Sequence, residues 1–216
     1  MKRRIFITGG TGYMGSRLIP LLLERGHEVI ALTRESSRQK LPAGCEAVVG
    51  NALNGDTFRA AVKNADTFVH LIGVRHPSAT KELEFREIDL KSGLESIRVA
   101  REAGLSHFAY LSVAHPAPMM KTYIEVRIKC EQALAESGMN PTILRPWYVL
   151  GPGHLWPYVL LPFYKMAELV PRTRESALRL GLVNIHQMVG ALLHATEDPA
   201  ISRRIWEPKD IRTFHV

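Results

Sequence analysis

A glycine-rich stretch directly after the first apolar run constrains the fold of this chain more than any other feature. Residues 5–7 read Ile-Phe-Ile, which favours a strand buried on both faces, as in a parallel sheet. Residues 8–15 read Thr-Gly-Gly-Thr-Gly-Tyr-Met-Gly, and residues 16–25 have the spacing of a helix. A strand, a glycine turn and a helix in this order predict the opening of a dinucleotide-binding βαβ unit.

Each glycine of the turn has a predicted role. Gly9 lets the chain turn sharply off the strand, Gly12 lets a pyrophosphate approach the backbone, and Gly15 lets the helix pack closely on the sheet. The helix N-terminus then offers free N–H groups to the phosphates. A tight turn without a ligand is the alternative. The residues expected to contact the dinucleotide here are Gly9, Thr11, Gly12, Tyr13, Met14 and Gly15.

Apolar runs and helical patterns alternate along the rest of the first 150 residues. We expect strands at 29–32, 48–49, 67–72, 108–113 and 142–144, and helices at 56–63, 81–103 and 121–137. This order predicts an α/β fold with a Rossmann-like, doubly wound parallel sheet. Residues 1–150 are the predicted NAD(P)-binding domain. Residues 151–216, with a helix at 185–196 and a late strand at 205–206, are expected to form a small substrate or lid lobe packed on it.

The charge balance and the cysteine content exclude several classes of function. The net charge is +7, but the basic residues are scattered, which favours a solvated surface over nucleic-acid binding and would still attract an anionic cofactor. The two cysteines, Cys45 and Cys130, and the nine histidines lack metal-ligand spacing. We therefore expect no metal, no membrane span, no signal peptide and a cytoplasmic, reducing location. A homodimer is left open.

The exit of the second strand decides which dinucleotide is expected. The loop begins with Thr33 and Arg34, where an NAD-binding protein usually carries a carboxylate. A guanidinium pairs with a 2′-phosphate, so the sequence favours NADP (NADPH), with NAD as the second choice. Glu35 favours NAD if it points inward, and a solvated Arg34 is a third interpretation.

Two further strand exits are candidates for cofactor contacts. Asn51, followed by Ala52 and Leu53, could hydrogen-bond an adenine edge or simply stabilise a turn. Leu71, Ile72 and Gly73 offer an apolar wall and a glycine past which a cofactor could run, or an ordinary strand end.

The reactive candidates follow the fifth strand. Ser112 ends that strand, and Tyr123 and Arg127 are four residues apart, on one face of the next helix, whereas Lys129 points elsewhere. A phenol beside a fixed cation could act as a general acid. The alternative makes Tyr123 a half-buried anchor and Arg127 a surface charge. The cluster of Trp156-Pro157-Tyr158 and Phe163-Tyr164 suggests a lobe core, the lining of an apolar pocket or a partner surface.

These motifs occur in one order and resemble the atypical short-chain dehydrogenase/reductase superfamily. The likeness rests on the glycine turn, Ser112, Tyr123 with a cation four residues on, Arg145-Pro146, and the Gly-Pro-Gly at 151–153. It is closest to the NAD(P)H-binding branch with NmrA-like proteins and relatives of the complex I 39-kDa subunit.

The resemblance implies a Rossmann fold that binds NAD(P)H and gives several residues a role. Ser112 matches the serine that orients a substrate carbonyl, and Tyr123 matches the proton donor. The family's lysine, which holds the nicotinamide ribose, is replaced by Arg127, which cannot readily relay a proton. Pro146 and Trp147 match the segment beside the nicotinamide.

Two functions follow as expectations. The first is an NADP-dependent oxidoreductase that reduces a carbonyl or enone of an unidentified small molecule, which Ser112 and Tyr123 favour. The second is a non-catalytic NADP(H)-binding redox sensor or an assembly or structural subunit, which Arg127 favours. A binder of nucleic acid or of a membrane surface, drawn by the positive charge, is a third.

Overall fold

The chain folds around a parallel sheet with helices on both faces. The computed structural model describes residues 1–74, 77–117, 119–153 and 159–216. Its seven-stranded sheet has the order β3-β2-β1-β4-β5-β6-β9, and all neighbouring strands run parallel. The strands are β1 (Arg4–Thr8), β2 (Glu28–Thr33), β3 (Glu46–Val49), β4 (Thr67–His70), β5 (His107–Leu111), β6 (Asn140–Leu144) and β9 (Arg204–Trp206). The predicted doubly wound fold is confirmed.

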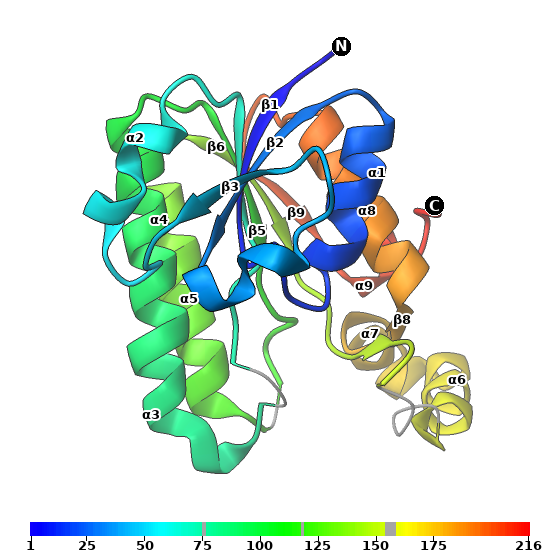
Figure 1. The fold of residues 1–216 in the computed structure, drawn as a ribbon. Coiled ribbons are helices and arrows are strands. Elements are labelled where there is room, and N and C mark those ends of the chain that lie inside the picture. The colour runs from blue at the N-terminus through cyan, green and yellow to red at the C-terminus, as the bar shows by residue number, and fades with distance from the viewer. Residues whose placement is uncertain (75–76, 118, 154–158) are drawn as a thin grey trace.

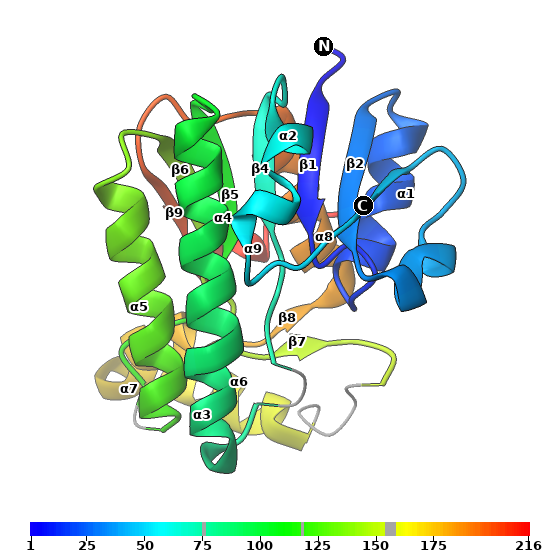
Figure 2. The same ribbon diagram turned by 60° about the vertical axis from the view of Figure 1, so that its left-hand side comes forward.

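Two helical layers cover the sheet (Figures 1 and 2). One face carries α2 (Arg59–Val62), α4 (Lys91–Glu102) and α5 (Lys121–Ala135), and the other carries α1 (Gly15–Glu24) and α8 (Ile185–Glu197). The first strand shows why both faces need cover. Ile5 and Ile7 pack in the core under α1 and α8, while Phe6 packs in the opposite core, its ring stacked on Phe58 with centroids 5.8 Å apart. Alternation along a strand fills both layers.

The predicted helix at 81–103 contains a break in its regular winding. A 3₁₀ turn at Ala79–Lys81 and a short α3 (Glu82–Glu84) lead into a π-helical segment, Phe85–Leu90, before α4 begins. A π segment adds a residue to the turn and so changes which side chains face inward. Here Asp89 is buried and Ile88 is 36% exposed.

The last part of the chain divides between the sheet and a separate hairpin. After a short parallel pair, β7 (Val149–Leu150) with β8 (Val183–Asn184), α8 returns to the sheet, and β9 pairs with β6. A final α9 (Pro208–Ile211) follows. Within the predicted lobe of 151–216, α6 (Leu161–Leu169) and α7 (Pro171–Arg179) lie beyond the carboxyl edge of the strands (Figure 1), whereas α8 packs on the sheet and β9 joins it. In the described residues no helix is both long and apolar enough to cross a membrane.

Candidate functional site

The glycine turn is built so that neither Gly9 nor Gly15 can carry a side chain. Gly9 has a φ of +78°, and a Cβ there would lie 2.8 Å from the carbonyl carbon of Leu71. A Cβ on Gly15 would lie 2.5 Å from the Cα of Gly10. Gly9 thus makes the sharp turn, as predicted, whereas Gly15 lets α1 begin against the backbone of the turn itself rather than against the sheet.

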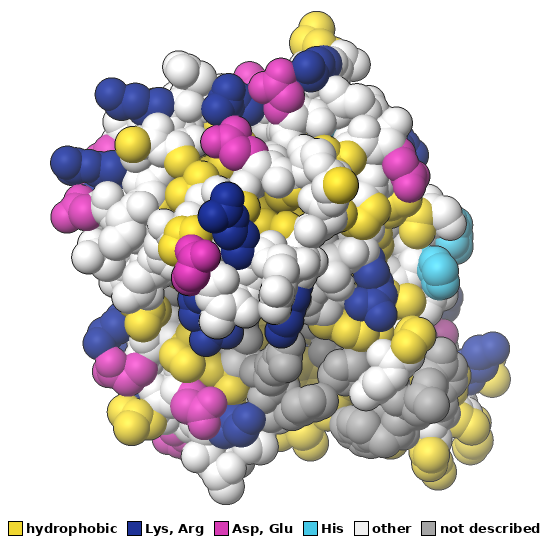
Figure 3. All heavy atoms as spheres, in the orientation of Figure 1, with side chains coloured by type: hydrophobic (Ala, Val, Ile, Leu, Met, Phe, Trp, Pro, Cys, Tyr) yellow, Lys and Arg dark blue, Asp and Glu magenta, His cyan; other side chains and the backbone are white. Residues whose placement is uncertain are grey.

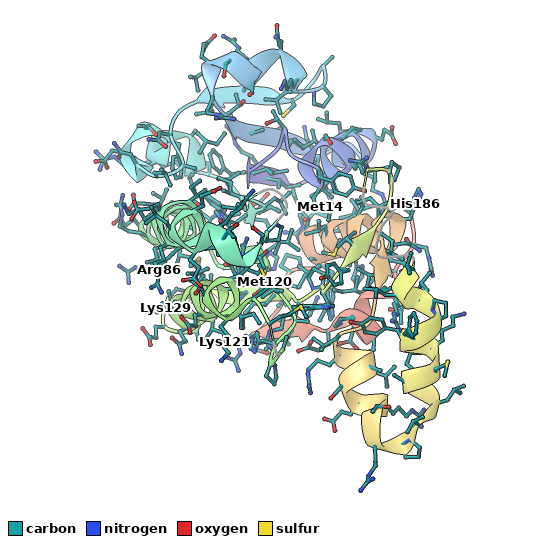
Figure 4. All side chains as sticks on the ribbon, turned by 90° about the horizontal axis from the view of Figure 1, so that it is seen from below. Met14, Arg86, Met120, Lys121, Lys129 and His186 are labelled. Carbon is teal, nitrogen blue, oxygen red and sulfur yellow. The ribbon has the colours of Figure 1, made fainter. Side chains whose placement is uncertain are left out.

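Gly12 and the start of α1 form a cradle that fits a diphosphate. The Gly12 N–H donates to the Gly9 carbonyl at 3.0 Å, and a Cβ on Gly12 would meet only that oxygen, at 3.1 Å. No side chain caps α1, and its first turn holds no acidic residue. The positive end of the helix is therefore available to an anion. Thr11, Tyr13 and Met14 lie half-buried along the turn, and Figure 4 shows Met14 on the side of α1 that faces the middle of the molecule.

We expect alanine at Gly12 and at Gly15 to separate ligand binding from folding. Gly12→Ala places a methyl group 3.1 Å from the Gly9 carbonyl oxygen, which must shift slightly, so NADPH affinity should fall at least about tenfold with a smaller drop in melting temperature than for Gly15→Ala. Gly15→Ala forces the backbone apart and should also destabilise the fold, by about 1–3 kcal/mol. Calorimetric titration and thermal melts measure both effects. Equal affinity of wild type and Gly12→Ala would contradict a pyrophosphate at Gly12.

Tyr13 connects the glycine turn to the start of the lobe. A Cβ on Gly151 would overlap the Tyr13 hydroxyl, so this glycine makes room for the phenol. On the other side, the Arg17 guanidinium lies over the Tyr13 ring, 4.1 Å from its centroid, and donates to the Tyr13 carbonyl at 2.7 Å. The ring is thus held between α1 and the segment after β7.

The exits of β2 and β3 lie on one side of the glycine turn, because β2 pairs with β1 and β3 pairs with β2. Thr33 is buried, and Arg34 is exposed at the start of a 3₁₀ helix, Glu35–Lys40, without an ion pair to any described residue. Asn51 accepts the Leu53 N–H at 3.0 Å, so its side-chain oxygen stabilises the turn that also holds Ala52. These positions remain predicted cofactor contacts.

The exit of β4 is occupied by a buried arginine. The Arg127 guanidinium lies 3.4 Å from the Ile72 carbonyl oxygen, and a Cβ on Gly73 would lie 2.6 Å from Arg127 Nη2. Gly73 therefore leaves room for this side chain. Leu71 and Ile72 are half-buried, and their role as an apolar wall beside the cofactor remains a prediction.

Arg127 is held by a buried ion pair. Its Nη2 lies 2.5 Å from Asp89 Oδ1, and the two side chains are 4% and 0% exposed. Arg127 Nη1 also donates to the Leu111 carbonyl at 3.1 Å, and the second Asp89 oxygen accepts the Val74 N–H at 3.0 Å. Burial raises the pKa of Asp89, while the guanidinium and the Val74 N–H oppose that rise. The pair ties the π segment to the ends of β4 and β5.

Tyr123 and Arg127 lie together, as their spacing predicts, with the Arg127 guanidinium over the face of the Tyr123 ring. The guanidinium carbon is 5.1 Å from the centroid of the Tyr123 ring, and Phe85 packs on the same ring at 4.9 Å. The Tyr123 hydroxyl has no hydrogen-bond partner in the described parts of the chain, so it can still serve a ligand. Lys129 lies on the outer side of α5 (Figure 4).

Ser112 is engaged by a carboxylate that the sequence did not single out. Its hydroxyl donates to Glu131 Oε1 at 2.5 Å. Glu131 also pairs with Arg145, whose Nε is 3.1 Å from Oε1, and lies 3.5 Å from His115 Nε2. Burial alone would raise the pKa of Glu131, but its contacts with His115, Arg145 and Ser112 outweigh burial and lower the pKa to about 2. Glu131 is thus ionised, and the Ser112 proton points to it.

The segment after β6 runs beside the end of β5. The Ala114 N–H donates to the Pro146 carbonyl at 2.9 Å, and Pro146 is buried. Trp147 is half-buried with its ring edge toward Tyr148, 5.5 Å between centroids. Within the described residues, no group of His, Cys, Asp and Glu side chains could hold a metal ion. The aromatic residues predicted at 156–158 lie outside the described residues.

The comparisons with known proteins agree with this geometry. Residues 9–153 match the model of a family described as NAD(P)H-binding. The chain is 28% identical over 145 residues to the photosystem II assembly factor Ycf39 of Synechocystis, covering 66% of this chain and 44% of that protein. It is 25% identical over 170 residues to a 4-hydroxy-2-methyl-3-oxo-4-farnesyl-3,4-dihydroquinoline-1-oxide ketoreductase of Stigmatella aurantiaca, covering 68% and 51%. The chain thus spans about half the length of these curated relatives.

Solved structures show the same fold. The Bordetella bronchiseptica enzyme WbmH in complex with NAD+ superposes with a TM-score of 0.72 and 20% identity, over 96% of this chain and 75% of that one. A Thermus thermophilus UDP-glucose 4-epimerase complex with NAD gives 0.68 and 18%, over 97% and 81%. The family match over most of the chain, with its glycine cradle and strand order, shows that this chain belongs to the NAD(P)H-binding family of atypical short-chain dehydrogenases/reductases.

Proposed function

We propose that this protein binds NADP(H) at the glycine cradle and acts as a redox sensor or assembly subunit, without reducing a carbonyl through a serine, tyrosine and lysine. The observation that carries the proposal is the ion pair between Arg127 and Asp89. The resemblance gives the residue at this place the task of holding the nicotinamide ribose. A guanidinium that is 4% exposed and paired inside the protein is not available for that task.

The other two candidate catalytic residues support the same proposal. The Ser112 hydroxyl donates its proton to Glu131 and so has none to offer a substrate carbonyl. The Tyr123 ring is tilted against Phe85 with the Arg127 guanidinium over its face, and no cation hydrogen-bonds its hydroxyl among the described residues. The name of one relative, an assembly factor, agrees with a binding role.

Reduction of a carbonyl or enone is the second candidate. It is favoured by the Tyr123 hydroxyl, which is without a partner in the described chain, and by the relative named as a ketoreductase. In that case Tyr123 would donate the proton while the dinucleotide supplies hydride when bound. A narrower likeness to NmrA-like proteins, a homodimer and a cytoplasmic location remain predictions.

The two candidates are separated by binding and turnover measured on the same protein. Calorimetric titration with NADPH should give saturable heat, while a panel of ketones, aldehydes and enones should cause no oxidation of bound NADPH. Turnover that Tyr123→Phe abolishes would overturn the proposal in favour of a reductase. Absence of heat with both NADPH and NADH would overturn both candidates.

The preference for NADP rests on Arg34. Its guanidinium is exposed at the exit of β2 and forms no ion pair with described residues, so it is free to meet a 2′-phosphate. We expect Arg34→Ala to weaken NADPH binding about tenfold and to leave NADH binding unchanged. Arg38→Ala, four residues after Arg34 and also exposed, is the matched control. Equal losses for the two dinucleotides would contradict this role of Arg34.

A further inference from the structure

The outer face of α6 is an apolar stripe that no described part of the chain covers. Its large side chains are exposed by 48–82%, and they recur at the spacing of one helical face. Figure 3 shows apolar side chains gathered at the lower right, over the position of α6 in Figure 1. The stripe consists of Val159, Phe163, Met166, Leu169 and Val170.

Contacts on the opposite face of α6 hold the helix so that the stripe points away from the protein. Glu168 pairs with Arg212 at 3.0 Å, and Arg212 donates to the Leu182 carbonyl at 2.9 Å. Tyr164 and Leu161 line the hollow between α6 and the β7–β8 pair. Leu161, Tyr164 and Glu168 thus face the protein, and the apolar stripe faces outward.

The hairpin that carries the stripe also carries unpaired cations. Lys165 on α6, and Arg172 and Arg174 on α7, are exposed and form no ion pair with any described residue. The one acidic residue of α6, Glu168, is turned inward to Arg212, which leaves Glu175 as the exposed carboxylate of the hairpin. The exposed surface of the hairpin is therefore apolar and net positive.

We propose that the α6–α7 hairpin docks on an anionic lipid surface. An apolar helical face flanked by Lys and Arg lies in the interface of such a membrane, and each nearby cation strengthens the attachment. The stripe is carried on a hairpin that projects beyond the sheet (Figure 1), a convex shape that can enter a headgroup layer. This inference is independent of the proposed function, because no residue of the hairpin belongs to the glycine cradle.

Leu83 on α3 shows that exposure alone does not make such a surface. It is 72% exposed, but its neighbours Glu82 and Glu84 are acidic and also exposed. An anionic surface would repel this position. Leu83 therefore provides a control with the same exposure and the opposite surroundings.

Sedimentation with lipid vesicles tests the proposal. Vesicles of phosphatidylcholine with about half phosphatidylglycerol should bind the wild type, and pure phosphatidylcholine vesicles should bind it far less. The double variant Phe163→Asp/Met166→Asp should bind the anionic vesicles at least about tenfold more weakly, whereas Leu83→Asp/Ile88→Asp should bind like wild type.

A second pair of variants tests the cations at equal net charge. Arg172→Glu/Arg174→Glu and the control Arg86→Glu/Lys129→Glu both lower the net charge from +7 to +3, because each exchange removes two units. Arg86 and Lys129 lie on the outer side of the helical layer that contains α4 and α5, away from the hairpin (Figure 4). The hairpin variant should bind at least about thirtyfold more weakly than wild type, and the control much less so.

Three outcomes would overturn the proposal. Wild type could fail to bind anionic vesicles, the control variants could lose binding as much as the hairpin variants, or light scattering could show a dimer that Phe163→Asp/Met166→Asp dissociates. In the last case the stripe is covered by a second copy of the chain. Unchanged circular dichroism and melting temperature of each variant show that the fold is intact.

Discussion

Arg127→Met is expected to lower the free energy of unfolding by about 3–5 kcal/mol, because it leaves the Asp89 carboxylate buried without its partner. Asp89 is 1% exposed, and the Arg127 guanidinium lies 2.5 Å from it. The change also removes the donor to the Leu111 carbonyl. Urea unfolding at neutral pH measures the loss.

A double variant separates the ion pair from the other contacts of Arg127. In Arg127→Met/Asp89→Leu both charges are absent, so at least half of the lost stability should return. Lys129→Met, four helical positions from Glu125 on the exposed side of the same helix, is the control and should change stability by less than about 0.5 kcal/mol. A single Arg127→Met that is as stable as this control would show that the pair contributes nothing to the fold.

Glu131→Gln is expected to lower the free energy of unfolding by about 3 kcal/mol at neutral pH, because the pKa of Glu131 is lowered from its ordinary value of 4.5 to about 2. A carboxylate whose pKa is depressed in the folded state adds stability above its ordinary pKa. That contribution is lost as the pH falls through the folded pKa. The stabilising contacts come from Ser112, Arg145 and His115.

The pH dependence of the difference between wild type and Glu131→Gln isolates this carboxylate. The difference in unfolding free energy should be full above pH 4.5 and should decline toward pH 2. Buried groups such as Asp89 titrate in both proteins and cancel from the difference. A difference that stays constant across this range would show that Glu131 does not carry a depressed pKa.

The parallel sheet and the glycine turn could be predicted because local signals determine them. Short apolar runs buried on both faces, each followed by a helix, are typical of a parallel sheet, and the seven strands form the predicted doubly wound sheet. The positive φ of Gly9 follows from the sharp turn between β1 and α1. The late strand at 205–206 is present as β9.

The partners of the candidate catalytic residues could not be predicted in the same way. A regular helix over 81–103 turns Ile88 inward, whereas the π segment exposes Ile88 and buries Asp89 beside Arg127. An inserted helical residue has no signal in the pattern of apolar positions. Glu131 lies one turn after Arg127, a spacing that the sequence does show, but its contact with Ser112 depends on how α5 packs beside β5.

The lobe illustrates a different limit. Phe163 and Tyr164 are adjacent in the sequence, and the pattern suggested one aromatic cluster. In the structure Tyr164 lines the hollow under α6, while Phe163 is 66% exposed on the outer stripe. Which side of a short helix meets the protein is decided by tertiary contacts, here by Glu168 and Arg212.

The most direct test of the account is a calorimetric titration of NADPH into the Arg127→Met/Asp89→Leu variant. If Arg127 is held by Asp89 and does not contact the dinucleotide, the double variant should bind NADPH within about threefold of the wild-type affinity. If this variant still unfolds cooperatively but binds NADPH more than about tenfold more weakly than wild type, the account is contradicted, because Arg127 would then hold the dinucleotide.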